Sequence, residues 1–141
     1  MTIFFQKNNK NSNALFAMIE AACEGLIYIS ETDAPVLPFA GGPADSVTRE
    51  IILQQITSEP NAPIEEVDFD LFFAWPTQVQ PWHGEPEKAR AEKFLELKKL
   101  LEENLRDRKV FRTGRIRLDI YVVGIDIDGN LMGITTKAVE T

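Results

Sequence analysis

The side chains that most often carry out catalysis are scarce in this sequence. The chain has one histidine, His83, and one cysteine, Cys23. Any catalytic triad would need His83 as its base, and His83 stands in a proline-containing segment that predicts a loop. Cys23 falls on the apolar side of a predicted helix, where a thiol is usually buried and inert. One histidine and one cysteine also cannot build a typical structural zinc site. The sequence therefore disfavours nucleophilic catalysis and a zinc centre.

Carboxylates are the remaining groups that could bind a hard cation or act as an acid/base pair. The densest cluster is residues 65–70, where acidic and apolar residues alternate as on a solvent-facing edge. An enzyme that uses Asp68 and Asp70 stays an open alternative. Residues 126–130 superficially match a calcium loop, but its twelfth position is Lys137 instead of glutamate. A hairpin turn explains that segment better, and we expect no cofactor and no metal ion of the protein's own.

The acidic charge is unevenly distributed along the chain, whose net charge is −7. Residues 1–70 hold eleven acidic residues against Lys7, Lys10 and Arg49, whereas residues 71–141 hold eleven against twelve basic ones. Direct nucleic-acid binding needs clustered lysine and arginine, so nucleic acid is disfavoured as a ligand. The asymmetry favours a partner with a positive surface. The alternative is that the acidic residues serve only solubility.

The length and composition suit one compact domain in a reducing compartment. The chain has 141 residues, of which 44% are hydrophobic, and its single cysteine permits no internal disulfide. No stretch approaches the ~20 apolar residues that cross a bilayer. The apolar run of residues 3–5 is too short for a signal peptide. We expect a soluble, cytoplasmic monomer in which residues 1–13 form a flexible segment before a single domain over residues 14–141.

The first half of the chain predicts short elements separated by polar turns. Residues 11–24 have helical periodicity, and Thr48 is a suitable cap for a short helix. Asp68 or Asp70 could cap another helix through Phe72 and Phe73. The remaining predictions are strands at 26–29 and 36–39, a polar turn at 30–35, loops at 41–43 and 58–63, and a helix at 49–55.

The second half predicts a loop, a long helix and a hairpin. After a loop at 76–84, the helix runs from Glu85 to about Arg108, and its buried stripe consists of Phe94, Leu97, Leu101 and Leu105. Residues 115–125 alternate as a strand, 128–130 form a turn, and 131–139 return as the last strand. The pattern predicts an α+β domain with helices packed on a mostly antiparallel sheet. The C-terminus should therefore be held near the sheet.

Five segments, from about residue 20 to the end, match one known family in order and spacing. They read GLIYISETDAP, TREIILQQ, NAPIEEVDFDLFF, QPWHGEPEKA and LDIYVVGIDIDGNLMGITTKAVET. The chain resembles the nuclease A inhibitor family of cyanobacterial type. The resemblance implies an α/β/α sandwich around a central antiparallel sheet. It also implies that the domain inhibits a sugar-non-specific ββα-metal nuclease, which cleaves DNA and RNA, by occupying its substrate cleft in a 1:1 complex.

The resemblance implies partner-binding roles for a few residues. Glu31 matches a family glutamate that contacts the nuclease active site, and Trp82 matches an interface tryptophan. Thr141 matches the terminal threonine, which reaches the region of the nuclease's catalytic Mg²⁺. Apart from the resemblance, the chemistry of the last two residues also favours binding, because Glu140 and Thr141 carry oxygen groups that could stand in for phosphate oxygens. Pro81 departs from the family pattern, because an acid is expected before the tryptophan.

The Pro81 departure puts the affinity for a standard partner in doubt, since an ion pair made there is lost or moves to Glu85. The main alternative function is an acidic interaction module. Such a module would imitate DNA and bind another basic protein that normally binds nucleic acid.

Overall fold

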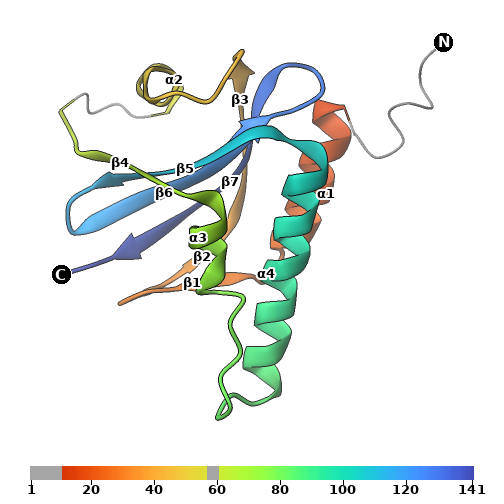
Figure 1. Ribbon diagram of the computed structural model, residues 1–141, viewed down its shortest axis with the longest axis vertical. Helices are drawn as coiled ribbons and strands as arrows, with labels where there is room; N and C mark the ends of the chain where they lie inside the picture. The colour runs from red at the N-terminus through yellow and green to blue at the C-terminus, as the bar shows by residue number, and fades with distance from the viewer. Residues whose placement is uncertain (1–10, 57–60) are drawn as a thin grey trace.

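A computed structural model describes residues 11–56 and 61–141 of the chain (Figure 1). Within these residues the helices are α1 (Ser12–Cys23), α2 (Arg49–Gln55), α3 (Phe69–Ala74) and α4 (Glu85–Asn104). The strands are β1 (Ile27–Ile29), β2 (Asp33–Pro35), β3 (Leu37–Pro43), β4 (Ile64–Val67), β5 (Arg106–Gly114), β6 (Arg117–Ile125) and β7 (Asn130–Val139). Strands β3-β7-β6-β5-β4 form one antiparallel sheet, and β1 and β2 form a separate hairpin. The predicted α+β fold is confirmed.

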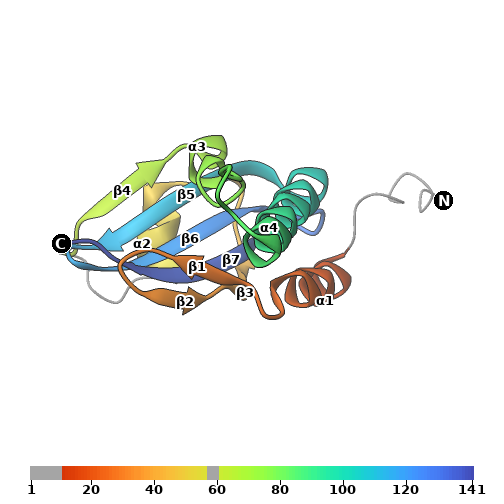
Figure 2. The ribbon, with the colours of Figure 1, turned by 90° about the horizontal axis from the view of Figure 1, so that it is seen from below.

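Helices cover both faces of the five-stranded sheet, in layers of unequal size. The larger core joins α1, α3 and α4 to one face, through residues such as Leu15, Phe73 and Leu101. The smaller core joins α2 to the other face, where Ile52 packs with Phe111. Figure 2 shows α3 and α4 in front of the sheet and α2 behind it. This arrangement is the α/β/α sandwich that the resemblance implied.

The turn between β6 and β7 anchors the start of α1. The Oδ1 atom of Asp126 accepts hydrogen bonds from the backbone N–H groups of Asp128 and Asn130, at 3.0 Å each. Its Oδ2 atom accepts from the Ser12 hydroxyl at 2.6 Å, and Asp128 accepts from the Ser12 N–H at 2.9 Å. These carboxylates therefore stabilise the hairpin turn that the sequence predicted, and they also anchor a helix N-terminus, which the sequence did not predict.

The prediction that the long helix continues to about Arg108 is wrong. Helix α4 ends at Asn104, Leu105 is extended, and β5 begins at Arg106. The guanidinium of Arg108 turns back and donates to the carbonyls of Glu102 at 3.3 Å and Leu105 at 2.5 Å. The cation therefore satisfies carbonyls at the end of the helix from the following strand, which allows the chain to leave the helical path.

The loop predicted at residues 41–43 is also wrong, because these residues belong to the edge strand β3. A bulge between Ala40 and Pro43 accommodates them against β7. The side chain of Gln55, at the end of α2, accepts from the Gly42 N–H at 2.7 Å and donates to the Pro43 carbonyl at 3.0 Å. A side chain of another element thus satisfies backbone groups that the sequence pattern left to a loop.

Three smaller boundaries also differ from the sequence predictions. The expected polar turn at 30–35 includes strand β2, and the expected strand at 36–39 begins at Leu37 and extends to Pro43. Strand β6 begins at Arg117, so Ile116 lies in the preceding turn and is exposed.

Two predictions fall partly outside the described residues. Of the loop at 58–63, residues 58–60 are outside, and of the flexible segment 1–13, residues 1–10 are outside; Ser12 and Asn13 belong to α1. In residues 11–56 and 61–141, none of the helices has the length and apolar character that crossing a membrane requires.

Candidate functional site

The end of the chain lies against the turn that joins β1 and β2. Strand β7 is paired with β6 as far as Val139, whose partner is Arg117. The Val139 N–H donates to the Ser30 hydroxyl at 3.0 Å, and the Glu31 N–H donates to the Val139 carbonyl at 3.3 Å. Figure 1 shows the C-terminus beside the tip of the β1–β2 hairpin. Two segments that are 110 residues apart in the sequence therefore meet at one edge of the molecule.

Glu31 and Thr141 bind each other directly at this edge. The Thr141 N–H donates to Glu31 Oε2 and the Thr141 hydroxyl donates to Glu31 Oε1, both at 2.8 Å. These bonds, first the backbone one and then the hydroxyl one, hold the pKa of the Glu31 carboxyl below its usual value. Both side chains are exposed. The contact thus presents an ionised carboxylate, a hydroxyl and the chain end to solvent at one point.

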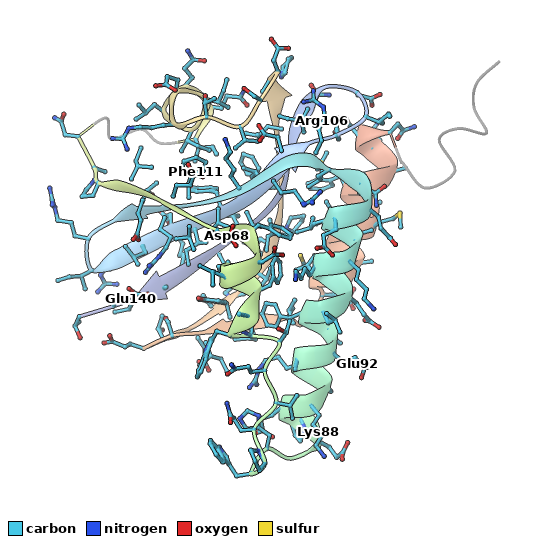
Figure 3. The ribbon with its side chains drawn as sticks, viewed as in Figure 1. Asp68, Lys88, Glu92, Arg106, Phe111 and Glu140 are labelled. Carbon is cyan, nitrogen blue, oxygen red and sulfur yellow. The ribbon has the colours of Figure 1, made fainter. Side chains whose placement is uncertain are left out.

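Glu140, the residue before the terminus, is held by the sheet. Its N–H donates to the Ile116 carbonyl at 2.9 Å, and its carboxylate pairs with Arg112 Nη2. Arg112 Nη1 also binds Glu65 Oε1 at 3.2 Å. The hydrogen bond to Glu140 is the main reason why the pKa of Arg112 is raised. Figure 3 labels Glu140 at the end of β7. We name this group of Glu65, Arg112 and Glu140 the Arg112 clamp.

Trp82 lies apart from the chain terminus, in the loop between α3 and α4. Its side chain is 77% exposed, and its indole contacts the His83 ring edge-on at 5.9 Å between centroids. The loop is held by the Gln80 N–H, which donates to His83 Nδ1 at 2.9 Å, and by the Gly84 N–H, which donates to Glu87 at 2.8 Å. The exposed tryptophan therefore stands on an ordered turn, which also contains Pro81.

The structure brings three of the four predicted site residues together and leaves the fourth, Trp82, apart from them on the loop between α3 and α4. Glu31, Glu140 and Thr141 share the edge at the chain terminus. Sequence reasoning missed the residues that position them, which are Ser30, Arg112 and Ile116. The run from Lys109 to Thr113, rich in β-branched and aromatic side chains, was the available signal for the strand that carries Arg112. Glu85 was the predicted replacement for the acid that is missing at Pro81. In the structure it pairs with Lys88 of its own helix at 3.9 Å.

The groups that suggested catalysis have structural roles. Burial raises the pKa of the Cys23 thiol to about 12, which leaves it protonated and unreactive at neutral pH. Asp68 caps α3 by accepting from the Leu71 N–H at 3.1 Å, and Asp70 pairs with Lys98 at 3.2 Å. Among the residues that the structure describes, no group of three or more histidine, cysteine, aspartate or glutamate side chains is arranged to hold a metal ion.

The protein is therefore an α+β domain whose chain end is hydrogen-bonded to Glu31 on the surface. The sequence model of one family, described as nuclease A inhibitor-like protein (NuiA), matches residues 13–141. The chain belongs to this family, and the family implies that it is a nuclease inhibitor with a nuclease as its partner. No curated protein matches the chain.

Proposed function

We propose that this protein inhibits a sugar-non-specific ββα-metal nuclease by placing its C-terminus in the substrate cleft. The single observation that carries the proposal is the pair of hydrogen bonds from Thr141 to the Glu31 carboxylate, each 2.8 Å long. This contact fixes the last residue of the chain on a folded support. A binding group that is already ordered loses less entropy when it binds than a disordered tail would.

The chemistry of this point matches a nuclease cleft. Such a cleft must hold phosphates, so it is basic and contains a hard cation, and Mg²⁺ prefers oxygen ligands. The terminal carboxylate and hydroxyl of Thr141 and the Glu31 carboxylate are oxygen groups that can take the places of phosphate oxygens. No phosphodiester is presented, so the nuclease has nothing to cleave. In this proposal the inhibitor is not an enzyme and has no cofactor, and the metal ion belongs to the nuclease.

Glu140 and Trp82 have different roles in this proposal. Because the Glu140 carboxylate pairs with Arg112, it holds the terminus against the sheet. Trp82, with its exposed indole, supplies a contact outside the metal centre, and tryptophan is enriched among the residues that dominate binding energy. Pro81 leaves this contact without the acid that the family pattern carries.

The net charge of −7 supports the same partner through long-range attraction. An acidic protein that approaches a basic cleft associates faster, by about 10- to 1000-fold in steered complexes, and salt weakens the effect. The proposal further includes a 1:1 complex, a cytoplasmic inhibitor and no direct contact between inhibitor and nucleic acid.

A nuclease inhibition assay tests the proposal. A purified sugar-non-specific ββα-metal nuclease is assayed on DNA and on RNA with the full chain, and with a variant that lacks Glu140 and Thr141. We expect the full chain to inhibit cleavage of both substrates, the truncated variant to inhibit much more weakly, and association to slow at higher salt. Thermal unfolding of the variant is the control for folding. Equal inhibition by both proteins would contradict the role of the terminus, and no inhibition by the full chain would contradict the function.

A further inference from the structure

The most exposed apolar side chains of the described residues come from one short part of the chain. Trp82 is 77% exposed, Leu71 70% and Trp75 65%, and Val79 between them is 49% exposed. We name Leu71, Trp75, Val79 and Trp82 the 71–82 stripe. Single exposed apolar residues are ordinary on protein surfaces, but several grouped together mark an interaction site.

Local structure holds the start of this stripe outward. Leu71 and Trp75 are four residues apart, hence neighbours on one side of α3 and its C-cap. The opposite side of α3 is anchored by Phe69, Phe72 and Phe73, which are buried in the larger core. The consequence is that α3 cannot rotate to bury Leu71 and Trp75 without exposing three phenylalanines.

Hydrogen bonds also hold the backbone that follows α3. The Thr77 hydroxyl donates to the Phe73 carbonyl at 2.6 Å, and the Gln78 N–H donates to the Trp75 carbonyl at 3.2 Å. The Trp75 and Val79 side chains therefore start from ordered backbone, and binding would not have to order that backbone first.

A pocket of about 110 Å³ lies directly beside the stripe. Trp75, Pro76 and residues of the following loop form one part of its wall. Residues of β1, including Ile29, and Glu87, Arg90 and Phe94 of α4 form the other part. Tyr28 of β1 stacks on Phe72 of α3 at 5.4 Å, which fixes the hairpin against the helix. Ile29 is two residues before Glu31, so β1 connects this pocket to the contact between Glu31 and Thr141.

The segment that carries the stripe is acidic, and cations of α4 offset part of its charge: Lys98 pairs with Asp70, Lys88 pairs with Glu85, and Arg90 lines the pocket. Residues 61–87 contain six acidic residues and neither lysine nor arginine; the acidic residues are Glu65, Glu66, Asp68, Asp70, Glu85 and Glu87. A surface that combines exposed indoles with carboxylates is complementary to arginine and lysine side chains, which stack on indole faces and pair with acids.

We propose that Leu71, Trp75, Val79 and the pocket beside them extend the contact proposed above for Trp82 into a second surface for the nuclease, outside the metal-containing cleft. This inference rests on the proposed function and extends it. A stable interface buries about 800 Å² on each partner, far more than the exposed surface of Glu31 and Thr141 can supply. The stripe continues from the terminus through β1, and it supplies the apolar anchors that the terminus lacks.

The test uses two alanine variants of the stripe and a matched control. Trp75→Ala and Leu71→Ala remove exposed side chains of the stripe, and Ile127→Ala removes a 45% exposed side chain in the turn between β6 and β7. Association and dissociation rates are measured with a purified sugar-non-specific ββα-metal nuclease. We expect Trp75→Ala to raise Kd about tenfold or more, mainly through faster dissociation, and Leu71→Ala to raise it less. The Kd of Ile127→Ala should stay within about twofold of that of the unsubstituted protein, since surface substitutions away from an interface change little.

Fluorescence gives a second measurement that does not depend on the alanine variants. The chain has two tryptophans, so Trp82→Phe leaves Trp75 as the single indole of the inhibitor. The variant is used at a concentration at which it still inhibits the nuclease fully, and the emission of the free nuclease is subtracted. The emission of Trp75 should shift to shorter wavelength when the nuclease is added, because the indole leaves water. Unchanged emission, together with equal Kd values for Trp75→Ala and Ile127→Ala, would overturn the inference. If the truncated terminus weakens inhibition but Trp75→Ala does not, only this inference fails; if the full chain does not inhibit, both proposals fail.

Discussion

The Arg112 clamp allows the position of the terminus to be perturbed without touching the residues proposed to bind the nuclease. The substitution Arg112→Met keeps an unbranched side chain along the same path and removes the guanidinium. Both ion pairs of Arg112, to Glu65 and to Glu140, are lost. Glu31 and Thr141 keep their own hydrogen bonds, so the chain end is loosened on one side only.

The expected effect is small because water reaches both acidic partners. The side chain of Arg112 is 21% exposed, but those of Glu65 and Glu140 are 66% and 53% exposed. Ion pairs of this kind contribute about 0.2–1 kcal/mol each, so the clamp contributes about 1 kcal/mol to folding. A loss of this size lowers Tm by about 3–5 °C in a domain of this length. If the nuclease must order the terminus again, the inhibition constant rises about fivefold, since 1.4 kcal/mol is a factor of ten.

Lys109→Met is the matched control for this prediction. Lys109 lies on the same strand, pairs with Asp107 at 3.7 Å and donates to the Val47 carbonyl at 2.8 Å, so its loss also destabilises the fold. Both variants are compared by thermal unfolding and by inhibition of a ββα-metal nuclease. Arg112→Met should lower Tm and weaken inhibition, whereas Lys109→Met should lower Tm and leave inhibition unchanged. Equal inhibition constants for the two variants would refute the role of the clamp.

Three further predictions concern the core, the thiol and pH. Phe73→Ala should destabilise the fold by about 3–5 kcal/mol in urea unfolding, because Phe73 is fully buried between Phe69 and Phe72; a loss below about 1 kcal/mol would contradict this packing. Cys23, with a pKa of about 12, should react with a thiol reagent at neutral pH only as fast as the protein opens, so added urea should speed the reaction. Since Glu31 has a lowered pKa in the fold, its bonds to Thr141 stabilise the docked terminus at pH values above the usual glutamate pKa of about 4.3 and are lost as pH falls through the lowered value. The Thr141 amide signal in an NMR titration should therefore stay constant near neutral pH and move only in acid, and movement between pH 6 and 8 would argue against the contact.

Elements with strong local signals were predictable from the sequence. Asn11 caps α1 by accepting from the Ala14 N–H at 2.8 Å, Thr48 caps α2, and Asp68 caps α3, all through side-chain chemistry visible in the chain. The buried face of α4 was also predictable, and the structure buries all of its predicted residues, which are Phe94, Leu97, Leu101 and Leu105. In these cases the residues that decide the structure are neighbours in the sequence.

Strand β5 was not predictable in the same way. Its first residues, from Arg106 to Lys109, are charged and suit a helix as well as a strand. Their conformation depends on distant partners: Asp107, at a positive φ of 53°, accepts from the Val47 N–H at 2.7 Å, and Arg106 donates to the Asp45 carbonyl at 2.9 Å. Such contacts across about 60 residues leave no local periodicity in the sequence.

In the candidate site, too, single residues could be predicted from the sequence, but the contacts between them could not. The resemblance pointed to Glu31 and Thr141 separately, as two residues that each match a family position. Their mutual hydrogen bonds, and the pairing of Glu140 with Arg112, depend on β5 and on the place of the β1–β2 hairpin. Without β5, sequence reasoning had no means of placing a cation beside Glu140.

The central claim is that Thr141 and Glu31 lie next to the metal ion of the nuclease. Paramagnetic broadening tests it most directly: the ¹⁵N-labelled inhibitor is bound to the nuclease loaded with Mn²⁺, with the Mg²⁺ complex as the diamagnetic reference. We predict that the amide signals of Thr141 and Glu31 broaden strongly, while those of Ile127 and Met18, at sites remote from the terminus, stay sharp. Sharp signals for Thr141 and Glu31 in a complex that still inhibits the nuclease would contradict the claim.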